Sequence, residues 1–171
     1  MLLLVDGGGS ERLARPARRD RRVMGAYPQL VLQNARVDEV ERCLSCLTDW
    51  ARRRGDVRGL ALVGSWARGV AHPGSDVDLV LLSLEPSLYI AQDDWLDEVG
   101  AEHLVRTVSW GVITERRFAL PGGLEVDMGV GLPAWAAVDP LNAGTQKVAA
   151  DGIRPLYDPE GLLARLLASV R

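Results

Sequence analysis

Two groups of residues near the middle of the chain have types and a spacing that suit chemistry. Gly64-Ser65 follows the apolar run 57–63, and Asp76-Val77-Asp78 comes ten residues later. A glycine lets the backbone turn sharply and approach a ligand, and the N–H and hydroxyl of the next residue can point at phosphate oxygens. The first group is therefore typical of a turn that grips polyphosphate.

The second group predicts a cation site. Residues 76–82 read as a strand, because the two aspartates are followed by a continuous apolar run, and Asp76 and Asp78 then project from the same face. Adjacent carboxylates repel each other and gain little from burial. The pair therefore favours a divalent cation with oxygen ligands, Mg²⁺ being the usual choice. A solvated acidic edge of a sheet is the alternative.

A third carboxylate is expected from the segment 123–130. Its alternation places Leu124, Val126 and Met128 on one face of a strand. Glu125 and Asp127 then lie on the other face. Asp127 is the first candidate and Glu125 the second, and the pattern itself leaves the choice open.

These residues resemble a known family. Gly64-Ser65, Asp76-x-Asp78 and a later strand carboxylate are similar to the nucleotidyltransferase superfamily typified by DNA polymerase beta. The run GSWARGVAHPGSDVDLVLL resembles small single-domain bacterial members, the minimal nucleotidyltransferases and relatives of the aminoglycoside and lincosamide nucleotidyltransferases. The resemblance covers roughly residues 36–165. It implies an α/β (α+β) fold like the polymerase beta palm, with one mixed sheet flanked by helices.

The resemblance also implies roles for individual residues. Gly64 and Ser65 bind the triphosphate, and Asp76 and Asp78 bind metal. Asp127 completes the carboxylate set and draws the proton from the attacking hydroxyl. Two Mg²⁺ ions would neutralise charge on the attacking and leaving oxygens. The co-substrate is a nucleoside triphosphate, with ATP expected.

Three further polar residues are candidates for the nucleotide. Arg68 would neutralise phosphate or be a solvated surface charge at a helix start. Lys147 begins an expected helix after a turn-rich segment and is either a triphosphate ligand or a solvent-facing lysine. His72 lies in the loop before the aspartates and either approaches the nucleotide or remains a mobile loop histidine.

Composition limits the classes of function. The chain has 171 residues, of which 47% are hydrophobic and 25% charged, as in one ordinary globular domain. Its net charge of −3 disfavours a template polymerase and a nucleic-acid partner. No apolar run is long enough to span a membrane. The arginine-rich residues 1–25 are expected to be a disordered extension, and residues 26–171 a single domain.

The two cysteines suggest no metal centre. Cys43 and Cys46 form C-x-x-C within a helical pattern, without a second pair or a nearby histidine, so they are interpreted as helix thiols in a reducing cytoplasm.

The patterns predict helices, strands and the packing of the tryptophans. Trp50, Trp95 and Trp110 are expected in the core or in helix packing. Trp66 either covers a ligand or packs the first helix after the turn onto the sheet. Helices are expected at 37–54, 66–70, 91–99, 145–150 and from 160, and strands at 57–63, 77–83, 104–109, 112–119, 123–130 and 153–157.

Three functional hypotheses follow from these observations. The first is transfer of AMP, or another NMP, to a hydroxyl of a small acceptor such as an antibiotic. The second is an antitoxin-type enzyme that adenylylates a partner toxin, and the third is a catalytically idle nucleotide-binding module. A chain of this length has no room for a dedicated acceptor domain. The acceptor wall is therefore expected from a loop, a second subunit in a homodimer or a partner.

Overall fold

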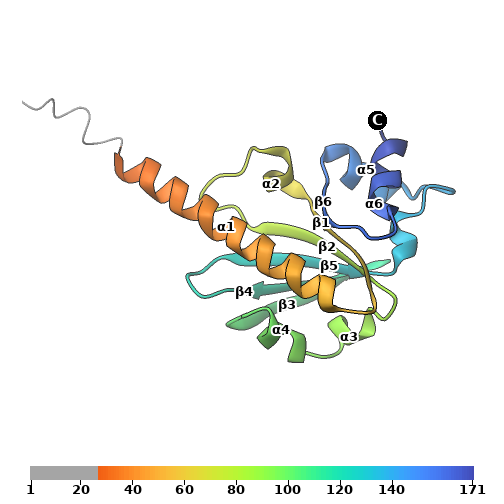
Figure 1. The fold of residues 1–171 in the computed structure, drawn as a ribbon, viewed down its shortest axis with the longest axis horizontal. Coiled ribbons are helices and arrows are strands. Elements are labelled where there is room, and N and C mark those ends of the chain that lie inside the picture. The colour runs from red at the N-terminus through yellow and green to blue at the C-terminus, as the bar shows by residue number, and fades with distance from the viewer. Residues whose placement is uncertain (1–26) are drawn as a thin grey trace, which may run out of the picture.

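The computed structural model describes residues 27–171, so the extension expected at residues 1–25 lies outside the described part of the chain. Six strands form one mixed sheet in the order β3-β4-β5-β2-β1-β6, with helices around it (Figure 1). This confirms the expected fold class. The elements are α1 (Tyr27–Arg53), β1 (Val57–Leu62), α2 (Gly64–Arg68), β2 (Val77–Ser83), α3 (Ser87–Ile90), α4 (Asp94–Glu98), β3 (His103–Trp110), β4 (Ile113–Ala119), β5 (Glu125–Gly131), the 3₁₀ helix η1 (Pro133–Ala136), α5 (Ala143–Asp151), β6 (Arg154–Tyr157) and α6 (Leu162–Ser169).

The register of the central strands is set by their buried faces. β2 and β5 are parallel, and Val77 lies opposite Val126 and Leu79 opposite Met128, all four fully or nearly fully buried. A slip by one residue would turn each of these side chains to the other face. The other described pairings, β1 with β2 and β6 and β4 with β3 and β5, are antiparallel.

Each face of the sheet has its own apolar cluster. On the first face the strands pack against α1, whose buried residues recur at the helical spacing of Val40, Leu44, Leu47 and Ala51. On the second face Val80 and its neighbours pack against η1, α5 and α6. In Figure 1 α5 and α6 gather beside β1 and β6, which leaves the β3–β4 side of this face without a helix.

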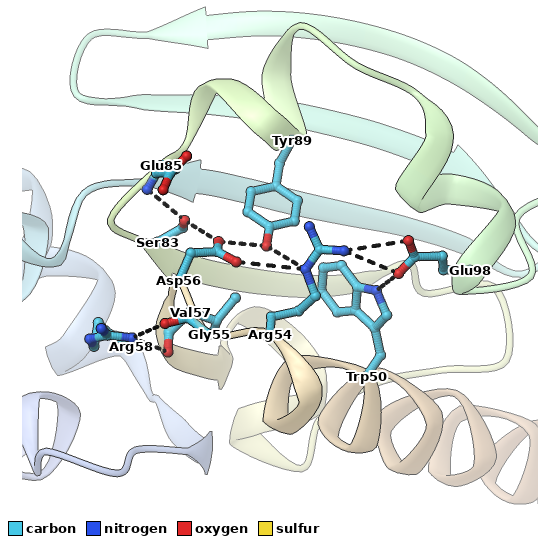
Figure 2. A network of polar contacts seen from close by, with 10 residues as sticks. All are labelled: Trp50, Arg54, Gly55, Asp56, Val57, Arg58, Ser83, Glu85, Tyr89 and Glu98. Atoms are coloured by element: carbon cyan, nitrogen blue, oxygen red, sulfur yellow. Dashed lines mark hydrogen bonds and ion pairs between the residues drawn. The ribbon is translucent and has the colours of Figure 1, made fainter.

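A polar network fixes the end of α1 to the sheet (Figure 2). Asp56 accepts hydrogen bonds from Ser83 and Tyr89, both at 2.6 Å. Arg54 reaches Glu98 at 3.2 Å, and Trp50 donates to the same carboxylate at 2.9 Å. Each carboxylate in the network has Arg54 and a neutral donor as partners, so we interpret it as structural. Asp56 precedes β1, so the network lies at the opposite end of that strand from Gly64.

Some expected elements were wrong in extent or missing. The first helix begins at Tyr27 rather than residue 37, and residues 32–35 in its early part are exposed, so no buried stripe marks them. The helix expected at 66–70 begins at Gly64, directly after β1. The helix expected at 91–99 is the shorter α4, preceded by a separate α3, and η1 was not expected. No helix of residues 27–171 has the length and apolarity that crossing a bilayer requires.

The tryptophans divide into core and surface residues. Trp50 and Trp95 are buried as expected and lie with their ring centroids 5.7 Å apart. Trp66 is half-buried against the α1-side cluster, which supports the packing role. The core placement of Trp110 was wrong, because 65% of its surface is exposed at the end of the edge strand β3.

Candidate active site

The turn after β1 lies directly against a carboxylate. Gly64 begins α2 with a φ of +67°, a conformation that L side chains rarely adopt. A Cβ at this position would lie 2.8 Å from Cγ of Asp78, which is too close for any residue but glycine. The backbone N–H of Val63 donates to the carbonyl of Asp78 at 2.9 Å. The glycine therefore lets the backbone pass close to Asp78 of β2.

The strand register brings the expected carboxylates to one place. Asp76 immediately precedes β2, and Asp78 is the second residue of that strand. Asp78 lies directly opposite Asp127 of β5. Partners in register point to the same face, which here is the second face of the sheet. Glu125 lies on this face as well, at the first position of β5.

The electrostatics of Asp78 reflect this crowding. Burial, followed by the charges of Asp127 and Asp76, raises the pKa of Asp78 from 3.8 to about 6. Arg117 and Arg68 act in the opposite direction and offset part of the effect. Burial and like charges thus disfavour the ionised form of Asp78, and a nearby cation would favour it.

Arg117 of β4 lies in the middle of the carboxylates and was missed by the sequence reasoning. It is opposite Asp127 in the β4–β5 register and donates two hydrogen bonds to that carboxylate. It also reaches Asp76 at 3.0 Å and Glu125 at 2.9 Å. Hydrogen bonding to Asp127, and the charges of all three carboxylates, raise the pKa of Arg117. This side chain is the cation that holds the cluster together.

A signal for Arg117 was present in the sequence. The expected strand 112–119 carries the charged run Glu115-Arg116-Arg117 between apolar ends, which is unusual for a strand next to the centre of a sheet. Alternation sends the two arginines to opposite faces. Arg116 is buried on the first face, where it contacts the carbonyl of Ile90 and the carboxylate of Asp93.

Comparison with known proteins agrees with this geometry. Residues 45–118 match the family model described as a nucleotidyltransferase domain, a range that contains Gly64, Asp76, Asp78 and Arg117 and ends before Asp127. The match covers about two fifths of the chain and supports a nucleotidyltransferase domain of the polymerase beta-like superfamily, a class of enzymes that use nucleoside triphosphates.

One solved structure is similar to part of this chain. Terminal uridylyl transferase 4 from Trypanosoma brucei with bound UPU is 18% identical and matches 76% of this chain and 46% of its own, with a TM-score of 0.32. This chain thus spans about half the length of that protein's chain. No curated protein matches the sequence.

The donor set of this nucleotidyltransferase fits a metal in its chemistry. Among residues 27–171 no group of three or more Asp, Glu, His or Cys is arranged to hold an ion. The guanidinium of Arg117 contacts Asp76 and Asp127 at once. Carboxylates of this kind are the ligands that Mg²⁺ prefers. A metal held by Asp76, Asp78 and Asp127 therefore requires Arg117 to move.

A cavity of about 210 Å³ adjoins the phosphate turn of the nucleotidyltransferase. Gly64, Arg68 and Asp78 line one side of it, and Val148 and Asp151 of α5 line the other. The stem of Arg68 runs along Gly152, where a Cβ would lie 2.9 Å from its Cγ. The structure therefore brings Arg68 to the cavity beside the carboxylates.

The structure does not bring the other two polar candidates to the carboxylates. Lys147 is exposed on α5, outside the residues that line the cavity. His72 is exposed in the loop before β2, where its Nδ1 accepts a hydrogen bond from the N–H of Gly74 at 3.1 Å. Cys43 and Cys46 lie on α1 as free thiols, the first buried and the second exposed.

Proposed function

We propose that this chain transfers AMP from ATP to a hydroxyl of a small-molecule acceptor such as an antibiotic, with Mg²⁺ as the metal. The observation that carries the proposal is the position of Asp78, which lies against the glycine turn on one side and opposite Asp127 on the other. Nucleotidyl transfer needs a phosphate grip and converging carboxylates side by side, and the nucleotidyltransferase family match supports the same reaction.

The triphosphate is assigned to the turn and the cavity next to it. Gly64 has no side chain, so the backbone there and the N–H of Ser65 can approach phosphate oxygens closely. Arg68 lines the same cavity and supplies positive charge to the leaving pyrophosphate. Asp76, Asp78 and Asp127 are assigned as metal ligands. When bound, the metal neutralises charge that builds up around the α-phosphorus.

The reaction proceeds as a displacement at that phosphorus. The acceptor oxygen forms a bond to the α-phosphorus, the bond from this phosphorus to the bridging oxygen of the β-phosphate breaks, and pyrophosphate leaves. Asp127 takes the proton of the acceptor hydroxyl, which requires an oxygen of that carboxylate to be free of Arg117.

Arg117 has a defined part in this proposal. It contacts Asp76 and Asp127 at once, and a metal held by these carboxylates and Asp78 would take its place on Asp127. The contact with Glu125 at 2.9 Å would then keep the guanidinium, and its positive charge, beside the site.

The test is a labelling experiment. The purified protein is incubated with Mg²⁺, each α-³²P-labelled NTP in turn, and aminoglycosides, lincosamides or co-encoded proteins. Transfer is read as label and NMP mass on the acceptor. We expect ATP to serve as donor and Asp127→Asn to slow transfer by about a hundredfold or more, because the proton acceptor is lost. Glu125→Gln should retain most of the activity, which would assign the third carboxylate to Asp127.

The matched control is Asp97→Asn, which removes an exposed aspartate of α4 on the other side of the sheet. It should transfer at the wild-type rate. Label found only on a co-encoded protein would replace the small-molecule acceptor by a protein acceptor. If no acceptor is labelled and Asp78→Asn binds Mg²⁺-ATP as well as the wild type, the proposed function is wrong.

A further inference from the structure

A second hollow lies on the second face of the sheet, next to the candidate active site. It consists of a cavity of about 320 Å³ and an adjoining one of about 230 Å³. Val112, Trp135, Asn142 and Thr145 line both, so the two are lobes of one space. We call it the hairpin hollow, because Trp110, Val112 and Ile113 of the β3–β4 hairpin form one wall.

The lining of the hairpin hollow is apolar. Neither lobe is lined by a charged residue from the described part of the chain. The side-chain oxygens of its Asn and Thr residues already make hydrogen bonds within the protein. The side-chain carbonyl of Asn142 accepts from the N–H of Gly144 at 2.8 Å, and the hydroxyl of Thr145 donates to the carbonyl of Trp135 at 3.0 Å. The space therefore offers surface contact to a ligand far more than hydrogen bonds.

Large apolar side chains stand exposed at its rim. Trp110 is 65%, Val112 67% and Leu132 51% exposed. The indole N–H of Trp110 donates to Glu115 at 3.1 Å, which fixes the orientation of the ring. Single exposed apolar residues are ordinary, but several around one hollow mark a binding site. A space of this volume is typical of pockets for small molecules.

The hairpin hollow is continuous with the cavity at the phosphate turn. Val63 and Val148 line both spaces. Gly129 leaves room for the side chain of Ile113 here, because a Cβ on Gly129 would lie 2.9 Å from Cγ2 of Ile113. A molecule in the hollow therefore reaches the edge of the space that contains Asp78 and Arg68.

The order of the strands indicates the side from which the acceptor reaches the carboxylates. In-line displacement places the leaving group and the attacking hydroxyl on opposite sides of the α-phosphorus. The phosphate turn follows β1, and the carboxylates lie on β2 and β5, so the hydroxyl approaches from the side of β4 and β3. Trp110, Val112 and Ile113 lie at the turn of that hairpin, and Ile113 is about 13 Å along β4 from Arg117, so an acceptor held there must extend along the sheet to reach the carboxylates.

We infer that the acceptor is an uncharged small molecule whose aromatic or aliphatic portion occupies the hairpin hollow. This inference rests on the proposed function and narrows its acceptor class. A polycation such as an aminoglycoside finds no carboxylate in the lining and would lose hydration there without compensation. A neutral ring gains from contact with Trp110, Val112 and Trp135.

The test uses hydroxyl-bearing probes of matched mass, half of them neutral aromatic alcohols such as chloramphenicol and half aminoglycosides such as kanamycin. Binding to the full chain with Mg²⁺ and a non-hydrolysable ATP analogue is measured by ligand-observed NMR and calorimetry. We expect neutral probes to bind and Val112→Lys to weaken them about tenfold or more, because an ammonium enters an apolar wall. The control Val105→Lys changes an exposed valine of the same hairpin outside the hollow and should bind as the wild type does.

The outcomes separate this inference from the proposed function. If the nucleotide analogue binds but no neutral probe does, or if Val105→Lys weakens the probes as much as Val112→Lys, the inference is wrong and the proposed function stands. If Val112→Lys weakens the analogue instead, the hollow holds the nucleobase, which also overturns the inference. If neutral probes bind in a Val112-dependent way but no nucleotide binds, the hollow stands as a ligand site and the proposed function fails.

Discussion

Arg117 is the residue whose replacement tests the candidate site most directly. In Arg117→Gln the three carboxylates of Asp76, Glu125 and Asp127 lose their common cation. Removing one partner of a buried ion pair costs about 3–5 kcal/mol. The Arg117 and Asp127 side chains are 20% and 14% exposed, so solvent screens part of this interaction. We therefore expect the metal-free variant to be less stable by about 2–3 kcal/mol.

Arg117→Gln should bind a divalent metal more tightly than the wild type does. If Arg117 and the metal need the same oxygens, binding to the wild type must first break the ion pairs, whereas the variant has none to break. The same 2–3 kcal/mol then becomes a gain in Mn²⁺ affinity of about 30- to 150-fold. Urea denaturation without metal gives the stability, and calorimetric titration with Mn²⁺ gives the affinity. Neither measurement depends on an acceptor.

Arg106→Gln is the matched control for this experiment. Arg106 lies opposite Arg117 on β3 and pairs with Glu115 at 2.8 Å, but 47% of its side chain is exposed. Such a surface pair contributes at most about 1 kcal/mol. The reasoning is refuted if Arg117→Gln is no less stable than Arg106→Gln, or if it binds Mn²⁺ no more tightly than the wild type.

Two further predictions concern Asp78 and the glycine turn. The pKa of Asp78 is about 6 in the folded protein, against an ordinary value of 3.8, so the folded state binds this proton more tightly than the unfolded state does. The metal-free protein therefore loses stability as the pH rises between these two values. At 1.36 kcal/mol per pKa unit the full effect on the free energy of unfolding is about 3 kcal/mol, which partial exposure of the side chain reduces to about 1–2 kcal/mol. In urea denaturation Asp78→Asn should therefore gain stability relative to the wild type as the pH rises from 4 to 8. A difference in stability that does not depend on pH would contradict this. Gly64→Ala should lose Mg²⁺-ATP binding and more stability than Gly69→Ala, because both have a left-handed φ but only the Cβ at 64 meets Asp78. Equal losses in calorimetry and thermal denaturation would argue against the clash.

The local pattern of apolar and polar residues was sufficient to predict much of the sheet. The strands at 57–62 and 77–83 are short apolar runs bounded by turns, and both formed almost where the pattern indicated. The alternation over 123–130 correctly assigned Val126 and Met128 to the core face and thereby placed Asp127 on the face of Asp78. In each case the buried face is visible in the residue types themselves.

What the sequence did not reveal depends on contacts between distant segments. Arg117 serves as a counter-ion because β4 lies next to β5, and no local sequence pattern predicts that pairing. Trp110 was expected in the core because large aromatics are usually buried, but its strand is the edge of the sheet. Residues 32–35 of α1 are exposed and have no buried stripe to detect.

The apolar face of the sheet is what keeps the repelling carboxylates together. Val77 and Leu79 on β2 and Val126 and Met128 on β5 are buried, each contributing about 1.5–3 kcal/mol, and their pairing fixes Asp78 opposite Asp127. This total exceeds the loss of about 2–3 kcal/mol expected when Arg117 is removed. The register therefore survives loss of the cation. Variants at Arg117 should consequently alter stability and metal affinity without moving the strands, so the site can exchange one cation for another on an unchanged sheet.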